Sequence, residues 1–323
     1  MLDGQGRTIN YLRISVTDRC NLRCLYCMPK EGVHAMEHRE ILSFEEIYRL
    51  VGIMTGLGIT HLRLTGGEPM ARKGCLKLAA GLNDIPGVES ISMTSNGLLL
   101  KDRIREVKEA GISSLNLSID SMDPEVYALL TRGGDVRDAL TTLRQALDEG
   151  MNVKVNAVPL RGYNEENLVS LAGLAIKDSL CVRFIELMPI GCGGEAGGIP
   201  IGEVEEVLEN AFGKPVPDTE IHGYGPAKYV KYSGFKGSVG FIGAVSHEFC
   251  DQCNRVRLTA DGQLKLCLNH TKGIDLRGML RGGMGDEAIR DAIAGAILEK
   301  PERHAFFERN ADLEVRCMNE IGG

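Results

Sequence analysis

The chain has 323 residues, of which 43% are hydrophobic, a share that supports a packed core and excludes an intrinsically disordered protein. Its length predicts one full-sized domain or one large domain with a smaller one. The 37 Lys and Arg against 44 Asp and Glu give a net charge of −7, which argues against nucleic acid as a partner, because phosphate affinity depends on clustered cations.

The sequence carries no export or membrane signal. Residues 1–16 show no cationic start followed by an apolar stretch, and no window approaches ~18 uninterrupted apolar residues. We therefore expect a cytoplasmic protein that does not enter a membrane. Ten cysteines in such a chain favour metal binding or reactive thiols over a disulfide framework, because the cytoplasm keeps thiols reduced.

The first two-thirds of the chain alternate between β-branched apolar runs and segments of helical period, which indicates βα units on a parallel sheet. The predicted strands are Tyr11–Val16, Thr60–Thr65, Ser90–Thr94, Ser114–Ile119, Asn152–Pro159 and Cys181–Leu187. The predicted helices between them are Phe44–Thr55, Lys73–Leu82, Asp102–Ala110, Val136–Glu149 and Glu165–Ile176. Six units instead of the eight of a closed barrel predict an α/β fold with an incomplete (βα)6 TIM-like barrel.

The remaining third predicts a C-terminal α+β extension that covers the open side of the barrel. It begins with a glycine-dense stretch, 191–198, which favours a flexible loop or linker. The further predicted elements are a helix at Ile201–Ala211, strands at Lys228–Tyr232, Ser238–Phe241, Arg255–Leu258 and Gln263–Leu266, and helices at Leu276–Leu280 and Asp286–Glu299. We expect a partial barrel over 1–190, a glycine-rich loop over 191–200 and a C-terminal region over 201–323.

Three cysteines stand directly after the first predicted strand, with the spacing C-x3-C-x2-C: Cys20, Cys24 and Cys27. Soft sulfur ligands select zinc or iron–sulfur clusters, and three ligands leave one metal position open to another molecule. The spacing therefore predicts a metal centre, and three buried free thiols are the alternative.

A second triad, Cys250, Cys253 and Cys267, has the spacing C-x2-C-x13-C. It predicts either a second iron–sulfur site or a zinc knuckle with His247 or His270 as the fourth ligand. Cys75, Cys181, Cys192 and Cys317 lack spaced partners and are expected to act as small apolar fillers, with Cys192 exposed in the glycine stretch.

The first cysteine loop, with Tyr26 before its last cysteine, resembles the signature of radical S-adenosylmethionine (SAM) enzymes. Gly66-Gly67-Glu68-Pro69 resembles the element of that superfamily that holds the SAM amino group, although an ordinary Gly-Gly turn would look similar. More specifically, the chain resembles the GTP 3′,8-cyclase family of molybdenum-cofactor (molybdopterin) biosynthesis. The markers are residues 15–21 (SVTDRCN), 131–134 (TRGG), 250–262 (CDQCNRVRLTADG) and the double-glycine end.

The resemblance implies two [4Fe–4S] clusters. Cys20, Cys24 and Cys27 would hold the one that binds SAM, and Cys250, Cys253 and Cys267 would hold a second one whose open iron binds guanine. It also implies SAM contacts from Tyr26, Gly67, Ser118 and Met188. By residue type alone, a core methionine is as good an interpretation of Met188 as a SAM contact. The same holds for Ser118, which could be a turn former at the end of a strand.

The resemblance further assigns GTP binding to six positions: Arg13, Arg63, Thr94, Lys154, Arg255 and Arg257. A triphosphate requires cations that donate charge-assisted hydrogen bonds, although any one of these cations taken alone reads as a solvated surface charge. Arg255 and Arg257 are also candidate catalytic residues that deliver a proton or order the radical. Gly322 and Gly323 are expected to thread into the site, where a frayed terminus is the alternative.

The implied activity is that of a lyase that converts GTP to 3′,8-cyclo-7,8-dihydro-GTP. The implied partners are a reductant protein such as flavodoxin or ferredoxin, a downstream cyclic pyranopterin monophosphate synthase, and a second copy in a homodimer. Residues 189–198 depart from the family pattern by being shorter and richer in glycine. A peptide-modifying radical SAM enzyme and a zinc-stabilised binding module remain the rival interpretations.

Overall fold

The computed structural model describes residues 1–246, 249–308 and 313–322. Its centre is a run of parallel strands in chain order: β1 (Tyr11–Ser15), β2 (His61–Thr65), β3 (Ser90–Ser95), β4 (Ile112–Ser118), β5 (Asn152–Ala157) and β6 (Cys181–Ile185). All six predicted strands are confirmed. Each pairs with its predecessor in parallel, as βα units require.

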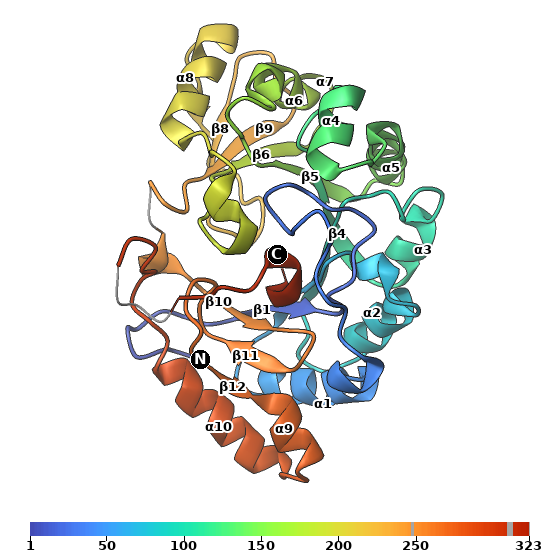
Figure 1. Ribbon diagram of the computed structural model, residues 1–323, viewed down its shortest axis with the longest axis vertical. Helices are drawn as coiled ribbons and strands as arrows, with labels where there is room; N and C mark the ends of the chain where they lie inside the picture. Colours follow the sequence, from blue (N-terminus) through green and yellow to red (C-terminus); the bar gives the residue numbers. More distant parts are fainter. Residues whose placement is uncertain (247–248, 309–312, 323) are drawn as a thin grey trace.

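Helices cover the convex side of the strands (Figure 1). They are α1 (Phe44–Thr55), α2 (Cys75–Asn83), α3 (Ile104–Glu109), α4 (Pro124–Thr131) and α5 (Val136–Asp148). The sequence analysis missed α4, although Asp123 caps it by accepting from the Glu125 and Val126 amides and proline occupies its first turn. The single helix expected at Glu165–Ile176 is divided into η3 (Glu165–Asn167), α6 (Leu168–Ala172) and α7 (Leu174–Lys177).

The C-terminal third extends the sheet at both ends. After α8 (Ile201–Phe212) come β7 (Val216–Pro217), β8 (Lys228–Lys231) and β9 (Ser238–Ile242), and β9 pairs in parallel with β6. Then β10 (Arg255–Leu258) pairs in parallel with β1 and is followed by β11 (Gln263–Lys265) and β12 (Gly273–Asp275). Eight parallel strands therefore lie between two short antiparallel ribbons, in the order β12-β11-β10-β1-β2-β3-β4-β5-β6-β9-β8-β7.

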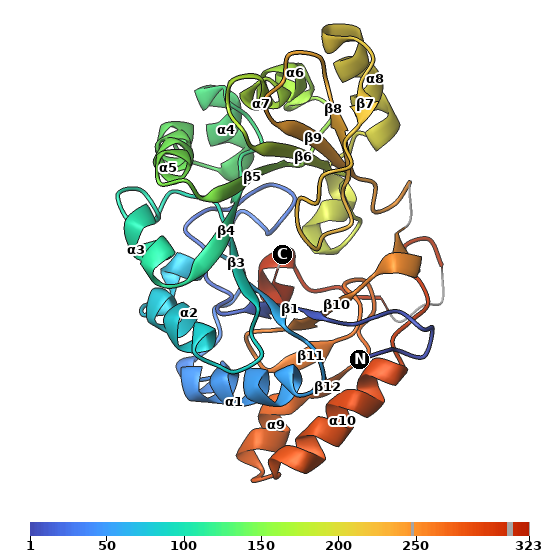
Figure 2. The same ribbon diagram turned by 180° about the vertical axis from the view of Figure 1, so that it is seen from behind.

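The final segments close the open barrel. Helices α9 (Leu276–Arg281) and α10 (Asp286–Leu298) pack near α1, and the chain then turns inward to α11 (Met318–Ile321). Both ribbon views place the C-terminal end within the concave side of the sheet (Figures 1 and 2). The predicted C-terminal covering of the open side is confirmed.

The glycine-rich stretch differs from the expected flexible loop, because residues Gly191–Glu195 form the 3-10 helix η4. Gly191 has φ +51°, and a Cβ there would lie 2.9 Å from the Arg316 carbonyl oxygen. At Gly193 a Cβ would lie 2.5 Å from the Met188 carbonyl oxygen. Close backbone contact therefore requires at least these two glycines.

Candidate active site

The two cysteine triads meet at one cavity. The carboxyl ends of parallel strands and the loops after them surround a cavity of about 330 Å³. Its wall includes all six cysteines singled out by spacing, namely Cys20, Cys24, Cys27, Cys250, Cys253 and Cys267. Residues more than 200 positions apart therefore share one chamber, since the C-terminal β10 lies directly beside β1.

The first cysteine loop is held by its own backbone and by the neighbouring strand. The Cys27 amide donates to the Cys24 carbonyl at 3.0 Å, and the Asn96 side-chain amide reaches the Cys20 sulfur at 3.8 Å. Burial raises the pKa of Cys20 and raises that of Cys27 to about 12, so the metal-free thiols stay protonated. Three thiols on one cavity wall suit a cluster that binds thiolates, because metal binding drives deprotonation.

The Gly66-Gly67-Glu68-Pro69 segment packs against this loop. A Cβ on Gly67 would lie 2.4 Å from the Arg19 carbonyl oxygen, and the Gly67 and Glu68 amides donate to Thr17 and Arg19 carbonyls at 2.8 Å. The fully buried Glu68 carboxylate accepts from Ser95 Oγ and the Asn96 amide, while burial raises its pKa to about 7. This segment therefore supports the cysteine loop and does more than an isolated turn would.

The four residues expected to contact SAM all line the cavity: Tyr26, Gly67, Ser118 and Met188. Tyr26 is fixed by Asp120, whose carboxylate accepts from its hydroxyl at 2.8 Å and from the Val158 amide at 2.8 Å. Burial raises the pKa of Asp120 to about 6. Asp120 thus positions Tyr26, a role that the sequence analysis did not assign.

The second triad has a different electrostatic setting. Burial raises the pKa of Cys253, but the positive charges of Arg255 and Lys300 outweigh it and bring that pKa to about 7. The Lys300 side chain is buried and donates to the Arg255 carbonyl at 2.9 Å. A thiol whose pKa lies near neutral pH is partly ionised, and the thiolate is the form that binds metal. Its donor set fits an iron–sulfur cluster as well as the first does.

The histidines proposed for a zinc knuckle do not complete this site within the described part of the chain. His270 Nε2 lies 3.1 Å from the Arg303 carbonyl oxygen, and His270 is not among the described residues that line the cavity. His247 lies outside the described residues.

Three arginines on neighbouring strands form a row along the cavity wall: Arg63, Arg13 and Arg257. Arg13 of β1 is in register with Arg63 of β2 on one side and with Arg257 of β10 on the other, so their side chains project from the same face of the sheet. All three line the cavity, as Arg255 does. Burial, and then repulsion from Arg255, lower the pKa of Arg257 to about 10. Such crowding of like charges is stabilised by a polyanionic ligand.

The cavity is strongly cationic although the whole chain is acidic. Among the described residues, six Lys and Arg side chains line it against two carboxylates, Asp120 and Glu186. Both carboxylates already accept hydrogen bonds, Glu186 from the Val245 and Ser246 amides at 2.7 Å. Cations therefore outnumber carboxylates in the described part of the cavity wall, which suits an anion such as a nucleotide.

The sequence analysis missed Arg183, one of the described cations of this cavity wall. We call these cations the cationic wall: Arg13, Arg63, Arg183, Arg255, Arg257 and Lys300. It extends from the middle of β6, and its Nε donates to Asn156 at 2.9 Å. A cation in the middle of an otherwise apolar strand was the available signal, because unpaired buried charges are rare outside functional sites.

Thr94 and Lys154 have different positions. Thr94 lines the cavity, and its buried hydroxyl has no hydrogen-bond partner in the described residues. Lys154 is not among the residues that line the cavity. Its buried ammonium group lies 3.3 Å from Asn152 and 3.4 Å from Ser114, and burial together with Arg183 lowers its pKa to about 8. Its assignment to GTP stays a prediction.

The C-terminal tail reaches the arginine row. Arg257 Nη1 donates to the Gly322 carbonyl at 2.7 Å, and Gly322 has φ +78°. A Cβ on Gly322 would lie 2.8 Å from the Cβ of Ser15 and 3.0 Å from Thr65 Oγ1. Glycine is therefore required here for both conformation and space. Gly323 lies outside the described residues.

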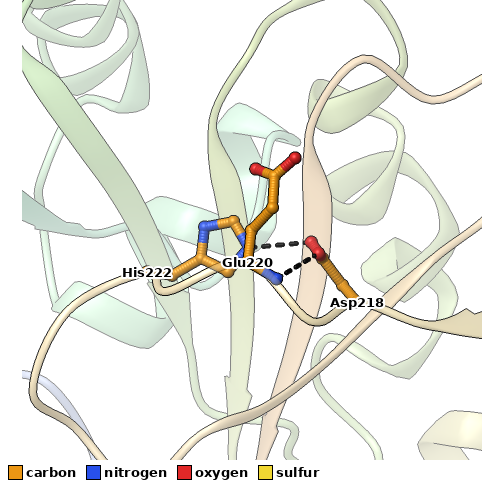
Figure 3. Close-up of side chains that lie close together, drawn as sticks. All are labelled: Asp218, Glu220 and His222. Carbon is orange, nitrogen blue, oxygen red and sulfur yellow. Dashed lines mark hydrogen bonds and ion pairs between the residues drawn. The ribbon is translucent and has the colours of Figure 1, made fainter.

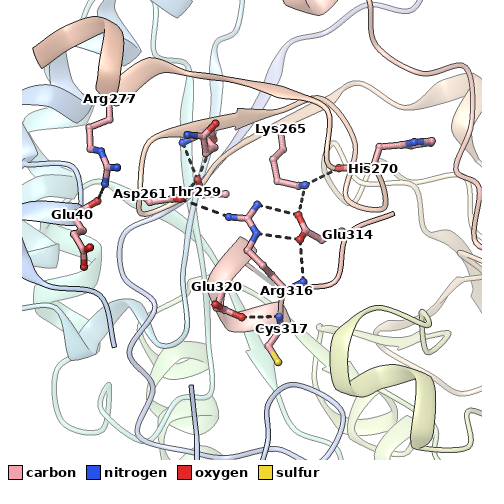
Figure 4. A network of polar contacts seen from close by, with 11 residues as sticks. Glu40, Thr259, Asp261, Lys265, His270, Arg277, Glu314, Arg316, Cys317 and Glu320 are labelled. Carbon is pink, nitrogen blue, oxygen red and sulfur yellow. Dashed lines mark hydrogen bonds and ion pairs between the residues drawn. The ribbon is translucent and has the colours of Figure 1, made fainter. Parts of the chain in front are cut away.

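A buried ion-pair network holds the segment that leads into this tail (Figure 4). Glu314 accepts from Lys265 and from Arg316, and the side chains of Lys265 and Glu314 are 1% and 2% exposed. Arg316 also lies 3.7 Å from Asp261. The tail is thus anchored to β11 before it enters α11.

A separate polar cluster closes the amino ends of the strands (Figure 3). His222 lies 2.7 Å from Asp218 and 3.2 Å from the sulfur of Cys181, the first residue of β6. Asp218 also accepts from Ser238 and from the Glu220 amide. Both carboxylate oxygens of Asp218 already accept hydrogen bonds. The cluster therefore has a structural role at the amino-terminal end of the barrel strands, the end whose residues serve stability.

None of the helices in the described ranges has the length and hydropathy that a bilayer crossing requires.

Comparisons with known proteins agree with this geometry. Residues 14–175 match the radical SAM superfamily, and residues 180–306 match the family described as Molybdenum Cofactor Synthesis C. GTP 3′,8-cyclases from Pelotomaculum thermopropionicum and from Clostridium perfringens strain SM101 are 47% and 41% identical to the chain, over the full length of both proteins in each case.

Among solved structures, Streptococcus suis SuiB bound to S-adenosylmethionine matches 97% of this chain and 77% of its own, with a TM-score of 0.64 at 12% identity. That likeness shows the fold. The full-length identity to curated relatives decides the family: the chain belongs to the GTP 3′,8-cyclase family of the radical SAM superfamily.

Proposed function

We propose that this chain is a GTP 3′,8-cyclase that converts GTP to 3′,8-cyclo-7,8-dihydro-GTP, the first step of molybdenum-cofactor synthesis. The observation that carries the proposal is one cavity lined by both cysteine triads and, among the residues that the structure describes, by six cations against two carboxylates. A chamber with this charge accepts a polyanion, and the triads provide two metal centres facing it.

Each triad would hold a [4Fe–4S] cluster, Cys20, Cys24 and Cys27 the first and Cys250, Cys253 and Cys267 the second. When bound, the clusters and SAM supply the electron and the radical that start the reaction, and the second cluster supplies an open iron for the purine. The protein's own part is to bind, orient and neutralise the substrate and to exclude water.

The triphosphate is assigned to Arg13 and Arg63 of the arginine row and to Arg183 of β6. Arg13, Arg63 and Arg183 line the cavity and would donate charge-assisted hydrogen bonds to phosphate oxygens. The Thr94 hydroxyl, which lacks a partner in the described structure, would find one on the ligand.

SAM is assigned to the part of the cavity beside the first cysteine loop. Tyr26 and Met188 would contact it, and Asp120 would keep Tyr26 in place through the 2.8 Å hydrogen bond. The Gly67 region would bind its amino group by backbone atoms, since no side chain fits there.

Arg257 is the candidate catalytic residue that contacts the C-terminal tail. It faces the cavity and holds the Gly322 carbonyl, so it links substrate position to the tail. Arg255 and Gly323 are proposed to act beside it. We infer a cytoplasmic enzyme supplied with electrons by a protein such as flavodoxin or ferredoxin, whose product passes to a cyclic pyranopterin monophosphate synthase.

The proposal is tested with anaerobically reconstituted protein, SAM and a reductant. Release of 5′-deoxyadenosine should require GTP, and the cyclised nucleotide should appear in step with it. Release that ignores GTP, or that depends on an added peptide instead, would contradict the proposal. A colourless protein that contains zinc and folds in air would support a binding module.

A further inference from the structure

Two cysteines outside both triads lie side by side. The sulfur atoms of Cys192 and Cys317 are 3.4 Å apart, although 125 positions separate them in the sequence. Both side chains are partly exposed. All four cysteines outside the triads are expected to be small apolar fillers, and for these two the structure adds a contact that no spacing in the sequence indicated. Cys75, which is 2% exposed within the core, fits that description.

The backbone around the pair permits this approach. A Cβ on Gly191 would lie 3.0 Å from the Cys317 Cα and 2.9 Å from the Arg316 carbonyl oxygen. The two chain segments thus pack backbone against backbone at the residue next to Cys192. On the other side, the Cys317 amide donates to Glu320 at 2.8 Å and opens α11.

The pair also lies close in sequence to two residues that line the cavity. Cys192 lies in η4, four residues after the cavity residue Met188. Cys317 precedes Met318, another cavity residue, whose amide donates to the Cys27 carbonyl at 3.2 Å. A covalent link here would join the segment after β6 to the tail that carries Gly322.

We propose that Cys192 and Cys317 form a reversible disulfide that locks the C-terminal tail onto η4. A disulfide has an S–S length of about 2.05 Å, so the two sulfurs need to approach by roughly 1.4 Å. Movement of this size is within the reach of two side-chain rotations in partly exposed residues.

The reaction is a thiol–disulfide exchange with a low-molecular-weight disulfide such as oxidised glutathione. One thiolate attacks the glutathione disulfide and releases one glutathione thiol. The second cysteine then attacks the mixed disulfide, releases the second glutathione thiol and closes the Cys192–Cys317 bond. The two cysteines are oxidised, the glutathione disulfide is reduced to two thiols, and a reductant reverses both steps.

The disulfide itself goes beyond the proposed function and does not depend on it. Its consequence for turnover does, because the tail carries Gly322, whose carbonyl accepts from the candidate catalytic residue Arg257. Under oxidative conditions in a cell, the Cys192–Cys317 disulfide would form close to the oxygen-sensitive metal sites. Its formation would follow the ratio of thiols to disulfides.

The test uses anaerobic holoprotein with both metal centres loaded, treated with oxidised glutathione and monitored for unchanged iron content. Thiols are then blocked with N-ethylmaleimide during denaturation, and the protein is digested for mass spectrometry. The expected result is one peptide pair joined through Cys192 and Cys317, which dithiothreitol separates. No such pair at full iron content, or a pair that joins either cysteine to a triad cysteine, would overturn the proposal.

A second readout follows the tail without any turnover. Carboxypeptidase should release the C-terminal glycines about tenfold more slowly from the oxidised than from the reduced wild type, because a locked tail opens less often. Cys192→Ser and Cys317→Ser should each abolish that difference. Cys75→Ala, a thiol with no thiol neighbour described, should retain it, and equal release rates in the wild type would contradict the lock.

Discussion

Arg257 Nη1 donates to the carbonyl oxygen of Gly322 at 2.7 Å. The bond joins β10, which is paired with β1, to a residue 65 positions later, and it sets the chain end against Ser15 and Thr65 at the carboxyl ends of β1 and β2. The segment that carries Gly322 is therefore a built part of the candidate active site.

Replacing Gly322 by alanine should displace this terminus. The new Cβ would lie 2.8 Å from Ser15 in a left-handed backbone conformation, so the tail has to leave its seat. We expect GTP-dependent product formation to fall by at least about tenfold, since displacements near 1 Å have such effects. Product assays and iron analysis measure this. Gly202→Ala, at an open helical position, is the matched control, and full activity of Gly322→Ala would contradict the tail's role.

Removing one cysteine from either triad should remove one cluster. Cys24→Ala and Cys253→Ala should each lower the iron content from about eight to about four per chain. Metal analysis and electron paramagnetic resonance of the reduced proteins would show a different remaining centre in each variant. Retention of about eight irons by either variant would mean that its triad is not the ligand set.

Arg183→Gln tests the cationic wall. The change leaves a side chain that still reaches Asn156 but removes a charge from the cavity. We expect KM for GTP to rise about tenfold or more, because a hydrogen bond to a charged group contributes about 1.5–3 kcal/mol. Affinity for SAM, which is assigned to Tyr26, Gly67, Ser118 and Met188, should stay constant. The control is Arg105→Gln, whose side chain is 82% exposed and pairs with Glu109. An unchanged KM would place the triphosphate elsewhere.

Gly67→Ala should disturb SAM binding more than GTP binding. Its Cβ would meet the Arg19 carbonyl oxygen at 2.4 Å, and backbone atoms of the first cysteine loop would have to move. A strain of about 1–3 kcal/mol corresponds to a loss of about fivefold to 150-fold in SAM affinity. Equilibrium dialysis of the anaerobic protein gives both affinities. Gly52→Ala in α1, where nothing lies within 4 Å, should behave as the wild type.

The Glu314 network should make stability depend on acid pH. Burial raises the pKa of Glu314, but hydrogen bonds from Arg316 and Lys265 outweigh it and hold that pKa at about 2 against an ordinary 4.5. A carboxyl with a depressed folded pKa contributes stability that is present above the unfolded value and is lost as pH falls through the folded value. This contribution, on the order of 2 kcal/mol, should therefore decline between pH 4.5 and 2.

Urea unfolding of the wild type and of Glu314→Gln across this range checks the prediction. The variant should be less stable by about 3 kcal/mol near neutral pH, because it leaves the buried Lys265 without its partner. It should also lose the decline in acid. The exposed control Glu109→Gln should change neither, and an acid decline that persists in Glu314→Gln would assign it to other groups.

Much of this structure could be predicted from the sequence. Period and composition gave all six barrel strands, because buried parallel strands have near-continuous apolar runs. The cysteine spacing located both triads, since local ligand spacing is visible in sequence. Helix α4 was missed because the connection between β4 and β5 contains two helices, α4 and α5. A regular alternation of one strand and one helix predicts only one of them.

The rest depended on contacts between distant segments. Arg183 could not be assigned to the cavity until the register of β5 and β6 was known. The pairing of Cys192 with Cys317 arises from the docking of a tail on η4, which no local pattern encodes. Lys154 is the reverse case, since family likeness assigned it to GTP, yet it is not among the described residues that line the cavity, and that assignment stays a prediction.

The parallel pairing of β1 with β10 has a consequence for biosynthesis. Strand β1 emerges from the ribosome first among the strands, yet its outer edge has no partner until residues 255–258 have been translated. During that interval a nascent chain exposes an open β-edge, the kind of surface that recruits other chains. Synthesis of this protein therefore places a demand on chaperones that lasts for about three-quarters of its length.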